Sequence, residues 1–221
     1  MTVEPFAVRF DDEPAVAGDL HIPQTPGDAA IVLTHGAGGD RHGLFLIKLA
    51  DALAERGVTA LRCDLPYRQK RSKGPPSPAG AASDREGLRR AADASRQRGA
   101  KQVWLGGSSY GGRQASMLVA EDAAVAEKLL LLSYPLHPPG KPERLRTEHF
   151  PRICTPTLFA HGSKDAFGTI EEVRTHLPSI PATTALEVFE GAAHGIIGAK
   201  SGEAKATAAA ARVAGALLAL Q

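Results

Sequence analysis

The sequence lacks several features that mark broad classes of protein. Only two of its 221 residues are cysteines, Cys63 and Cys154, and they form neither a CxxC pair nor a Cys/His cluster with metal-ligand spacing. The formal net charge is only +2, so no strongly basic surface favours nucleic acid. We therefore expect no metal, no nucleic-acid partner and two reduced, partly buried thiols.

Apolar runs long enough to cross a membrane are also missing. The most apolar part of the tail, residues 206–220, is rich in alanine, and Arg212 interrupts it. This segment is too short for a membrane span and is better explained as a packed helix. The first residues do not combine a basic segment with an apolar one, which is the pattern of a secretion signal. The sequence thus predicts a cytoplasmic protein that does not associate with membranes.

What the sequence does contain is an alternation of short apolar runs with helical periodicity. Hydrophobic residues make up 43% of the chain, which is enough for a sizeable core, and no internal repeat is present. Strands alternating with helices favour an α/β fold with a mainly parallel sheet, here as a single domain over residues 1–221. We expect a hairpin within 5–22, strands at 29–34, 58–63, 102–106, 128–133, 156–160 and 185–189, and helices after residue 44 and at 83–98, 111–120, 171–176 and 203–220.

Two local features refine this plan. Ser83, with Glu86 three residues later, predicts a capping box at the start of the 83–98 helix. Two stretches rich in proline and glycine, residues 68–80 and 134–142, follow predicted strands. In parallel sheets, ligands bind beyond the carboxyl ends of the strands, so these stretches are expected near a binding site.

The most informative segment is residues 103–112, which read Val-Trp-Leu-Gly-Gly-Ser-Ser-Tyr-Gly-Gly. An apolar strand followed by Gly-x-Ser-x-Gly and a helix is typical of a nucleophile elbow. Gly107 and Gly111 leave space around a sharply turned Ser109, which would be the nucleophile. The alternative is a Gly-rich turn without chemistry.

A serine nucleophile needs a base and an acid that orients the base. Asp165 follows the strand expected at 156–160, and His194 follows the strand expected at 185–189, which gives the order Ser, Asp, His. Taken singly, the aspartate could be a cap and the histidine a solvated side chain. Other groups fit less well because of their position, namely His35, His161, His137, His149 and the rival acid Glu190.

An acyl-transfer centre also needs donors for its oxyanion. The backbone N–H of Tyr110 directly follows the nucleophile, and we expect the second donor to be the N–H of Ala37 in the loop His-Gly-Ala-Gly-Gly at residues 35–39. A phosphate cradle is the alternative for this loop. It lacks the Lys-Ser/Thr ending of a P-loop and the full GxGxxG spacing.

These segments together resemble the α/β-hydrolase superfamily, specifically its small, lidless, dienelactone-hydrolase-like members. The resemblance implies an eight-stranded sheet with helices on both faces, no large cap domain, and Ser109, Asp165 and His194 as the catalytic residues. Residues 132–141 resemble a narrower branch, which includes the hydrolase-like domain of the NSL chromatin-complex subunit. The segments that carry the superfamily resemblance are 34–39, 107–112, 161–165 and 191–194.

The sequence therefore predicts a serine hydrolase that cleaves a small carboxylic ester or thioester through an acyl-enzyme, without a cofactor. A non-catalytic binding or scaffold protein with the same fold is the alternative, and an acyltransferase or perhydrolase would use the same residues. A group of basic side chains lies on or just after the two irregular stretches: Arg68, Lys70, Arg71, Lys73, Lys141, Arg144 and Arg146. They form either a solvated rim or a site for an anionic substrate.

Overall fold

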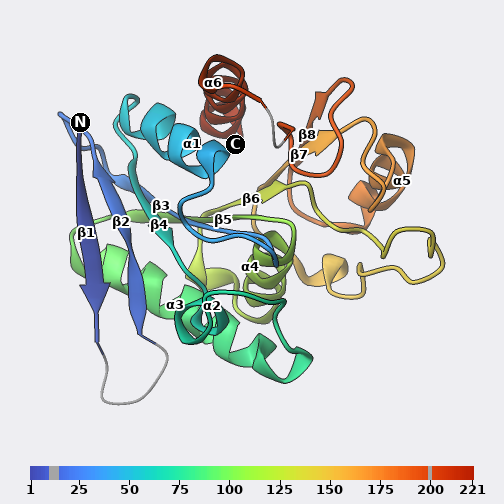
Figure 1. The fold of residues 1–221 in the computed structure, drawn as a ribbon, viewed down its shortest axis with the longest axis horizontal. Coiled ribbons are helices and arrows are strands. Elements are labelled where there is room, and N and C mark those ends of the chain that lie inside the picture. Colours follow the sequence, from blue (N-terminus) through green and yellow to red (C-terminus); the bar gives the residue numbers. More distant parts are fainter. Residues whose placement is uncertain (10–14, 199–200) are drawn as a thin grey trace.

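A computed structural model describes residues 1–9, 15–198 and 201–221, and one eight-stranded sheet runs through it (Figure 1). The strand order is β1-β2-β4-β3-β5-β6-β7-β8. The pairs β1–β2 and β2–β4 are antiparallel and all other neighbours are parallel, which confirms the predicted mainly parallel sheet. The strands are β1 (Thr2–Val8), β2 (Val16–Ile22), β3 (Ala29–Thr34), β4 (Thr59–Cys63), β5 (Gln102–Ser108), β6 (Lys128–Leu132), β7 (Thr157–Gly162) and β8 (Thr184–Phe189).

Helices cover both faces of this sheet, as the resemblance implied. In Figure 1, α1 (Leu44–Ala54) and α6 (Glu203–Ala219) lie above the sheet, and α3 (Ala81–Gln97) and α4 (Tyr110–Glu121) lie below it. No large cap covers the sheet in the described part of the chain. The remaining helical segments are short: α2 (Pro66–Lys70), α5 (Ile170–His176) and single turns of 3₁₀ helix at Pro78–Gly80, Ala123–Val125, Phe150–Arg152 and Leu177–Ser179.

Strand β3 shows why the central strands are continuously apolar. Its side chains alternate between the two faces, and both faces are covered by helices. Ile31 and Leu33 belong to the core that includes Leu49 of α1, whereas Val32 belongs to the core that includes Leu88 of α3. All three strand residues are fully buried.

Some local predictions were wrong. Helix α3 begins at Ala81 rather than Ser83, with Gly80 as N-cap and no side-chain cap, because the preceding 3₁₀ turn leads directly into the helix. A capping box does form in α5, where the Thr169 hydroxyl accepts from the Glu172 N–H and the Glu172 carboxylate accepts from the Thr169 N–H.

The two cysteines differ in their exposure. Cys63 is buried in β4, whereas Cys154 is exposed, so the expected partial burial was wrong for Cys154, and neither forms a disulfide. In the described ranges, no helix is long and apolar enough to cross a membrane, and no three His, Cys, Asp or Glu side chains form a group that could hold a metal ion. Residues 11–14, in the middle of the hairpin expected within 5–22, lie outside the described residues.

Candidate active site

The predicted elbow is present at the junction of β5 and α4. Ser109 has φ +49°, a left-handed conformation that non-glycine residues rarely adopt. A Cβ atom on Gly107 would lie 2.6 Å from backbone atoms of Gly111 and Gly112, so glycine is required there. The Ser109 N–H donates to the carbonyl of Leu132 at 2.8 Å, which fixes the turn to the end of β6.

Ser109, His194 and Asp165 lie in one hydrogen-bonded chain. The Asp165 carboxylate, which follows β7, accepts from Nδ1 of His194 at 2.8 Å. Nε2 of His194, which follows β8, lies 2.8 Å from Oγ of Ser109. Because the carboxylate only accepts, Nδ1 carries the proton and Nε2 is free to accept from the serine hydroxyl. The Asp165 side chain is fully buried and that of His194 is 26% exposed.

Two further residues hold this chain in place, and the sequence analysis missed both. The Phe167 ring stacks on the His194 imidazole with 4.1 Å between centroids, and its N–H donates to Oδ1 of Asp165 at 2.8 Å. The Ser133 hydroxyl accepts from the N–H of Gly195 at 3.0 Å. The sequence did not indicate either contact, because each residue acts through contacts between loops.

The residues predicted to supply the oxyanion donors lie beside Ser109. A Cβ atom on Gly36 would lie 3.4 Å from Cβ of Ser109, so the loop after β3 contacts the elbow directly. Tyr110 is the first residue of α4, and its N–H therefore has no acceptor within the helix. Ala37 and Tyr110 both line the cavity above Ser109.

A brace of side chains connects these two donors. The Tyr67 hydroxyl donates to the carbonyl of Ala37 at 2.9 Å, and Nη2 of Arg68 donates to the same carbonyl at 3.1 Å. The buried Asp84 carboxylate accepts from the Tyr67 N–H at 3.0 Å and from the Tyr110 hydroxyl at 2.7 Å. Burial raises the pKa of Asp84, and burial together with the Asp84 charge raises the pKa of Tyr110. The brace was not predicted, because Tyr67 and Asp84 meet only in the folded chain.

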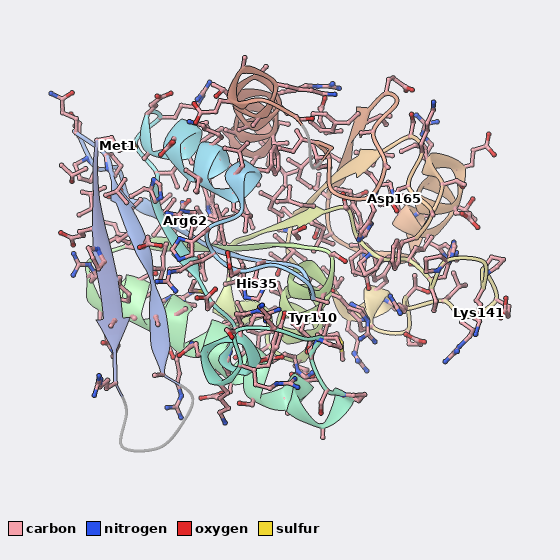
Figure 2. The ribbon with its side chains drawn as sticks, viewed as in Figure 1. Met1, His35, Arg62, Tyr110, Lys141 and Asp165 are labelled. Atoms are coloured by element: carbon pink, nitrogen blue, oxygen red, sulfur yellow. The ribbon has the colours of Figure 1, made fainter. Side chains whose placement is uncertain are left out.

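The rival residues have other roles. The His35 ring accepts from the N–H of Leu65 at 3.2 Å, and the His161 ring donates to the carbonyl of Gly168 at 2.8 Å. Both histidines therefore hold loop backbone in place, and burial lowers the pKa of each. Glu190 is exposed. Figure 2 shows His35 close to Tyr110, away from Asp165.

A cavity of about 940 Å³ lies above Ser109 and His194. Both irregular stretches border it, one through Pro75, Pro76 and Pro78 and the other through Pro135, and Arg146 lies just beyond the second stretch. Its wall is otherwise largely apolar, with side chains that include Phe45, Leu46, Phe167, Ile196 and Ile197. An apolar cavity with a few convergent polar groups is the usual form of a small-molecule site.

The match to known sequences decides the family. Residues 27–220 match the alpha/beta hydrolase domain. The chain belongs to the alpha/beta hydrolase family. Membership supports a hydrolase, and the described residues, which form no large cap, agree with the dienelactone-hydrolase-like type.

Solved structures agree on the fold of this alpha/beta hydrolase. An alpha-beta serine hydrolase homologue from Coxiella burnetii is 18% identical, with a TM-score of 0.76 and 98% of each chain covered. A dienelactone hydrolase from Anabaena variabilis is 21% identical, with a TM-score of 0.72 and 96% of each chain covered. Est1E from Butyrivibrio proteoclasticus is 14% identical, with a TM-score of 0.75 and 97% of each chain covered. These identities are low, so the likeness concerns architecture.

Proposed function

We propose that this alpha/beta hydrolase is a serine hydrolase that cleaves a carboxylic ester or thioester. The observation that carries the proposal is the continuous hydrogen-bond chain from Asp165 through His194 to Ser109, beneath a mostly apolar cavity. A serine hydroxyl is a weak nucleophile at neutral pH, and this geometry supplies the base that it needs.

The proposed reaction has two halves. In the first, Ser109 Oγ attacks the carbonyl carbon while His194 Nε2 takes the hydroxyl proton, and Asp165 stabilises the imidazolium. The N–H groups of Ala37 and Tyr110 donate to the oxyanion, and His194 then protonates the leaving alcohol or thiol. In the second, water attacks the acyl-enzyme with the same base, and the acid is released.

A fluorophosphonate probe tests the nucleophile, because it reacts covalently with activated serines. The wild type should be labelled at Ser109, and labelling should vanish in Ser109→Ala and fall sharply in His194→Ala. Ser108→Ala is a matched control, since this neighbouring serine is not hydrogen-bonded to His194, and it should remain labelled.

Turnover of 4-nitrophenyl esters of short and long acids provides the second readout. Loss of the hydrogen bond to the base in Asp165→Asn should lower kcat by up to about 10⁴-fold, because the imidazole takes the wrong tautomer. A wild-type protein that neither reacts with the probe nor cleaves any ester would contradict the proposal and favour a binding protein with this fold.

A further inference from the structure

The basic residues of the two irregular stretches separate into different groups in the structure. Arg68 is buried and donates to backbone carbonyls, including that of Ala37. Lys141 and Arg144 are exposed, and Figure 2 shows Lys141 at the tip of an outer loop far from Tyr110. Arg146, in contrast, lines the cavity above Ser109. It is accompanied there by Arg113, which the sequence analysis did not single out.

Arg113 lies one helical turn beyond the nucleophile. Its N–H donates to the carbonyl of Ser109 at 2.9 Å, so its Cα lies about 6 Å further along the axis of α4. Its side chain is partly buried, and Nε is buried without a hydrogen-bond acceptor. The adjacent Gln114 is fully buried and lines the same cavity, and its side-chain Nε2 also lacks an acceptor. Buried donors without acceptors are rare in native proteins.

Arg146 is fixed by its backbone to the segment after β6. Its N–H donates to the carbonyl of Leu136 at 2.9 Å, and its own carbonyl accepts from the Tyr134 hydroxyl at 2.6 Å. The guanidinium makes a long hydrogen bond of 3.4 Å to the carbonyl of Pro135. Burial and the neighbouring charge of Arg113 lower the pKa of Arg146.

Within the described part of the chain, neither guanidinium has a counter-ion. Among the described residues, no carboxylate lies within 4.0 Å of a side-chain nitrogen of Arg113 or Arg146, and Glu148, which interacts electrostatically with Arg146, is exposed. Two positive charges that are close enough to repel, in a mostly apolar cavity, are unfavourable unless an anion joins them. Other arginines of this protein, such as Arg41 and Arg62, have carboxylate partners.

We propose that Arg113 and Arg146, with Gln114 as a neutral donor, form a subsite for an anionic group of the substrate. The inference rests on the proposed hydrolysis at Ser109 and specifies its substrate class: an ester or thioester that carries a carboxylate or phosphate away from the scissile carbonyl. Guanidinium groups bind both anions through paired N–H donors, so the two share the same recognition chemistry.

A pair of matched esters tests the subsite. Mono-4-nitrophenyl adipate and 4-nitrophenyl hexanoate have acyl chains of equal carbon number and differ in the terminal carboxylate. The wild type should prefer the adipate ester in kcat/KM, and the preference should fall about 10- to 100-fold in Arg113→Gln and in Arg146→Gln, because each removes a charge-assisted hydrogen bond. Arg113→Lys keeps the charge but not the planar fork, and should retain part of the preference.

Arg144→Gln is the matched control, because it removes an exposed charge two residues from Arg146, and Arg144 does not line the cavity. It should leave the ratio of the two kcat/KM values unchanged, and an equal loss in this variant would mean that only long-range steering operates. Competition by free adipate, hexyl phosphate and hexanoate against the hexanoate ester distinguishes a carboxylate from a phosphate site. Inhibition by adipate alone identifies a carboxylate site, and inhibition by hexyl phosphate alone identifies a phosphate site.

The outcomes separate this inference from the proposed function. Cleavage of the hexanoate ester with no preference for the adipate ester, or a preference that survives both glutamine substitutions, would refute the subsite and leave Ser109 catalysis intact. Failure to cleave either ester, together with failed probe labelling of Ser109, would refute the proposed function itself. Thermal melting of each variant confirms that the folded protein is being measured.

Discussion

Replacing Gly111 with alanine provides a steric test of the oxyanion site. Gly111 is the second residue of α4, where alanine is favoured over glycine by up to about 1 kcal/mol in a helix. The added Cβ, however, would lie 2.5 Å from the carbonyl oxygen of His35 and 2.6 Å from Cγ2 of Thr34. Real Cβ contacts below 3.0 Å are essentially never observed, so the helix and the loop after β3 must separate by about 0.5 Å or more.

This separation moves one proposed oxyanion donor away from the other, since Ala37 lies on the loop and Tyr110 on the helix. Misplacement by about 1 Å can reduce a rate about 100-fold, and loss of one donor reduces it about 100- to 1000-fold. We therefore expect kcat/KM of Gly111→Ala to fall about 100-fold. The unfolding free energy should fall by only about 0–2 kcal/mol, because overpacking of about 1–3 kcal/mol is offset by helix propensity.

The assay combines ester hydrolysis with urea unfolding of the same preparations. Gly215→Ala is the control, because Gly215 lies within α6 and an added Cβ there meets no atom within 4 Å. It should gain about 0.5–1 kcal/mol in stability and keep wild-type kcat/KM. A Gly111→Ala protein whose kcat/KM stays within about threefold of wild type would refute the role assigned to this contact.

Two further predictions concern the brace and the buried residue His149. Tyr67→Phe removes the hydroxyl that holds the Ala37 carbonyl, so kcat should fall about tenfold with a smaller change in KM, and unchanged kinetics would show that Arg68 holds the loop unaided. Burial lowers the pKa of His149 to about 4. The unfolded chain therefore binds this proton more tightly than the folded protein does, so the contribution of neutral His149 to stability is complete above about pH 6.5 and is lost as the pH falls. Urea unfolding should show that His149→Gln loses about 2 kcal/mol less than wild type between about pH 7 and pH 5, and parallel losses would contradict this.

The ends of the strands explain how much of the site could be predicted from sequence. A parallel sheet brings the carboxyl ends of its strands to one edge, so residues that directly follow apolar runs are placed by strand order alone. Ser109, Asp165 and His194 were placed in this way, and the structure brings their side chains together. Their catalytic roles remain a proposal that the probe experiment tests.

The brace and the proposed anion subsite were beyond sequence reasoning for a physical reason. Asp84 and Tyr67 lie on different helical segments, and only tertiary packing brings the carboxylate to the Tyr67 N–H. Arg113 could be placed near Ser109 from its spacing, but its missing counter-ion is a property of everything that surrounds it. The cap of α3 was wrongly placed at Ser83 because a 3₁₀ turn extends the helix backwards, and helix ends are set by such local competition.

The loop after β3 shows why such surrounding residues matter for catalysis. It contains Gly36, Gly38 and Gly39, so it has little rigidity of its own, yet oxyanion donors act only when they are held in advance of the reaction. Arg41 lies towards the α1 end of the loop. Its N–H donates to Oδ1 of Asp64 at 2.8 Å, and its Nε donates to Oδ2 of the Asp19 carboxylate at 2.9 Å. At the other end, the side chains of Tyr67 and Arg68 donate to the carbonyl of Ala37. Side chains of β2 and of the segment after β4 therefore hold this flexible loop at both ends. Rigidity at the proposed oxyanion site is therefore a property of the whole fold, which a motif search over the loop alone does not reveal.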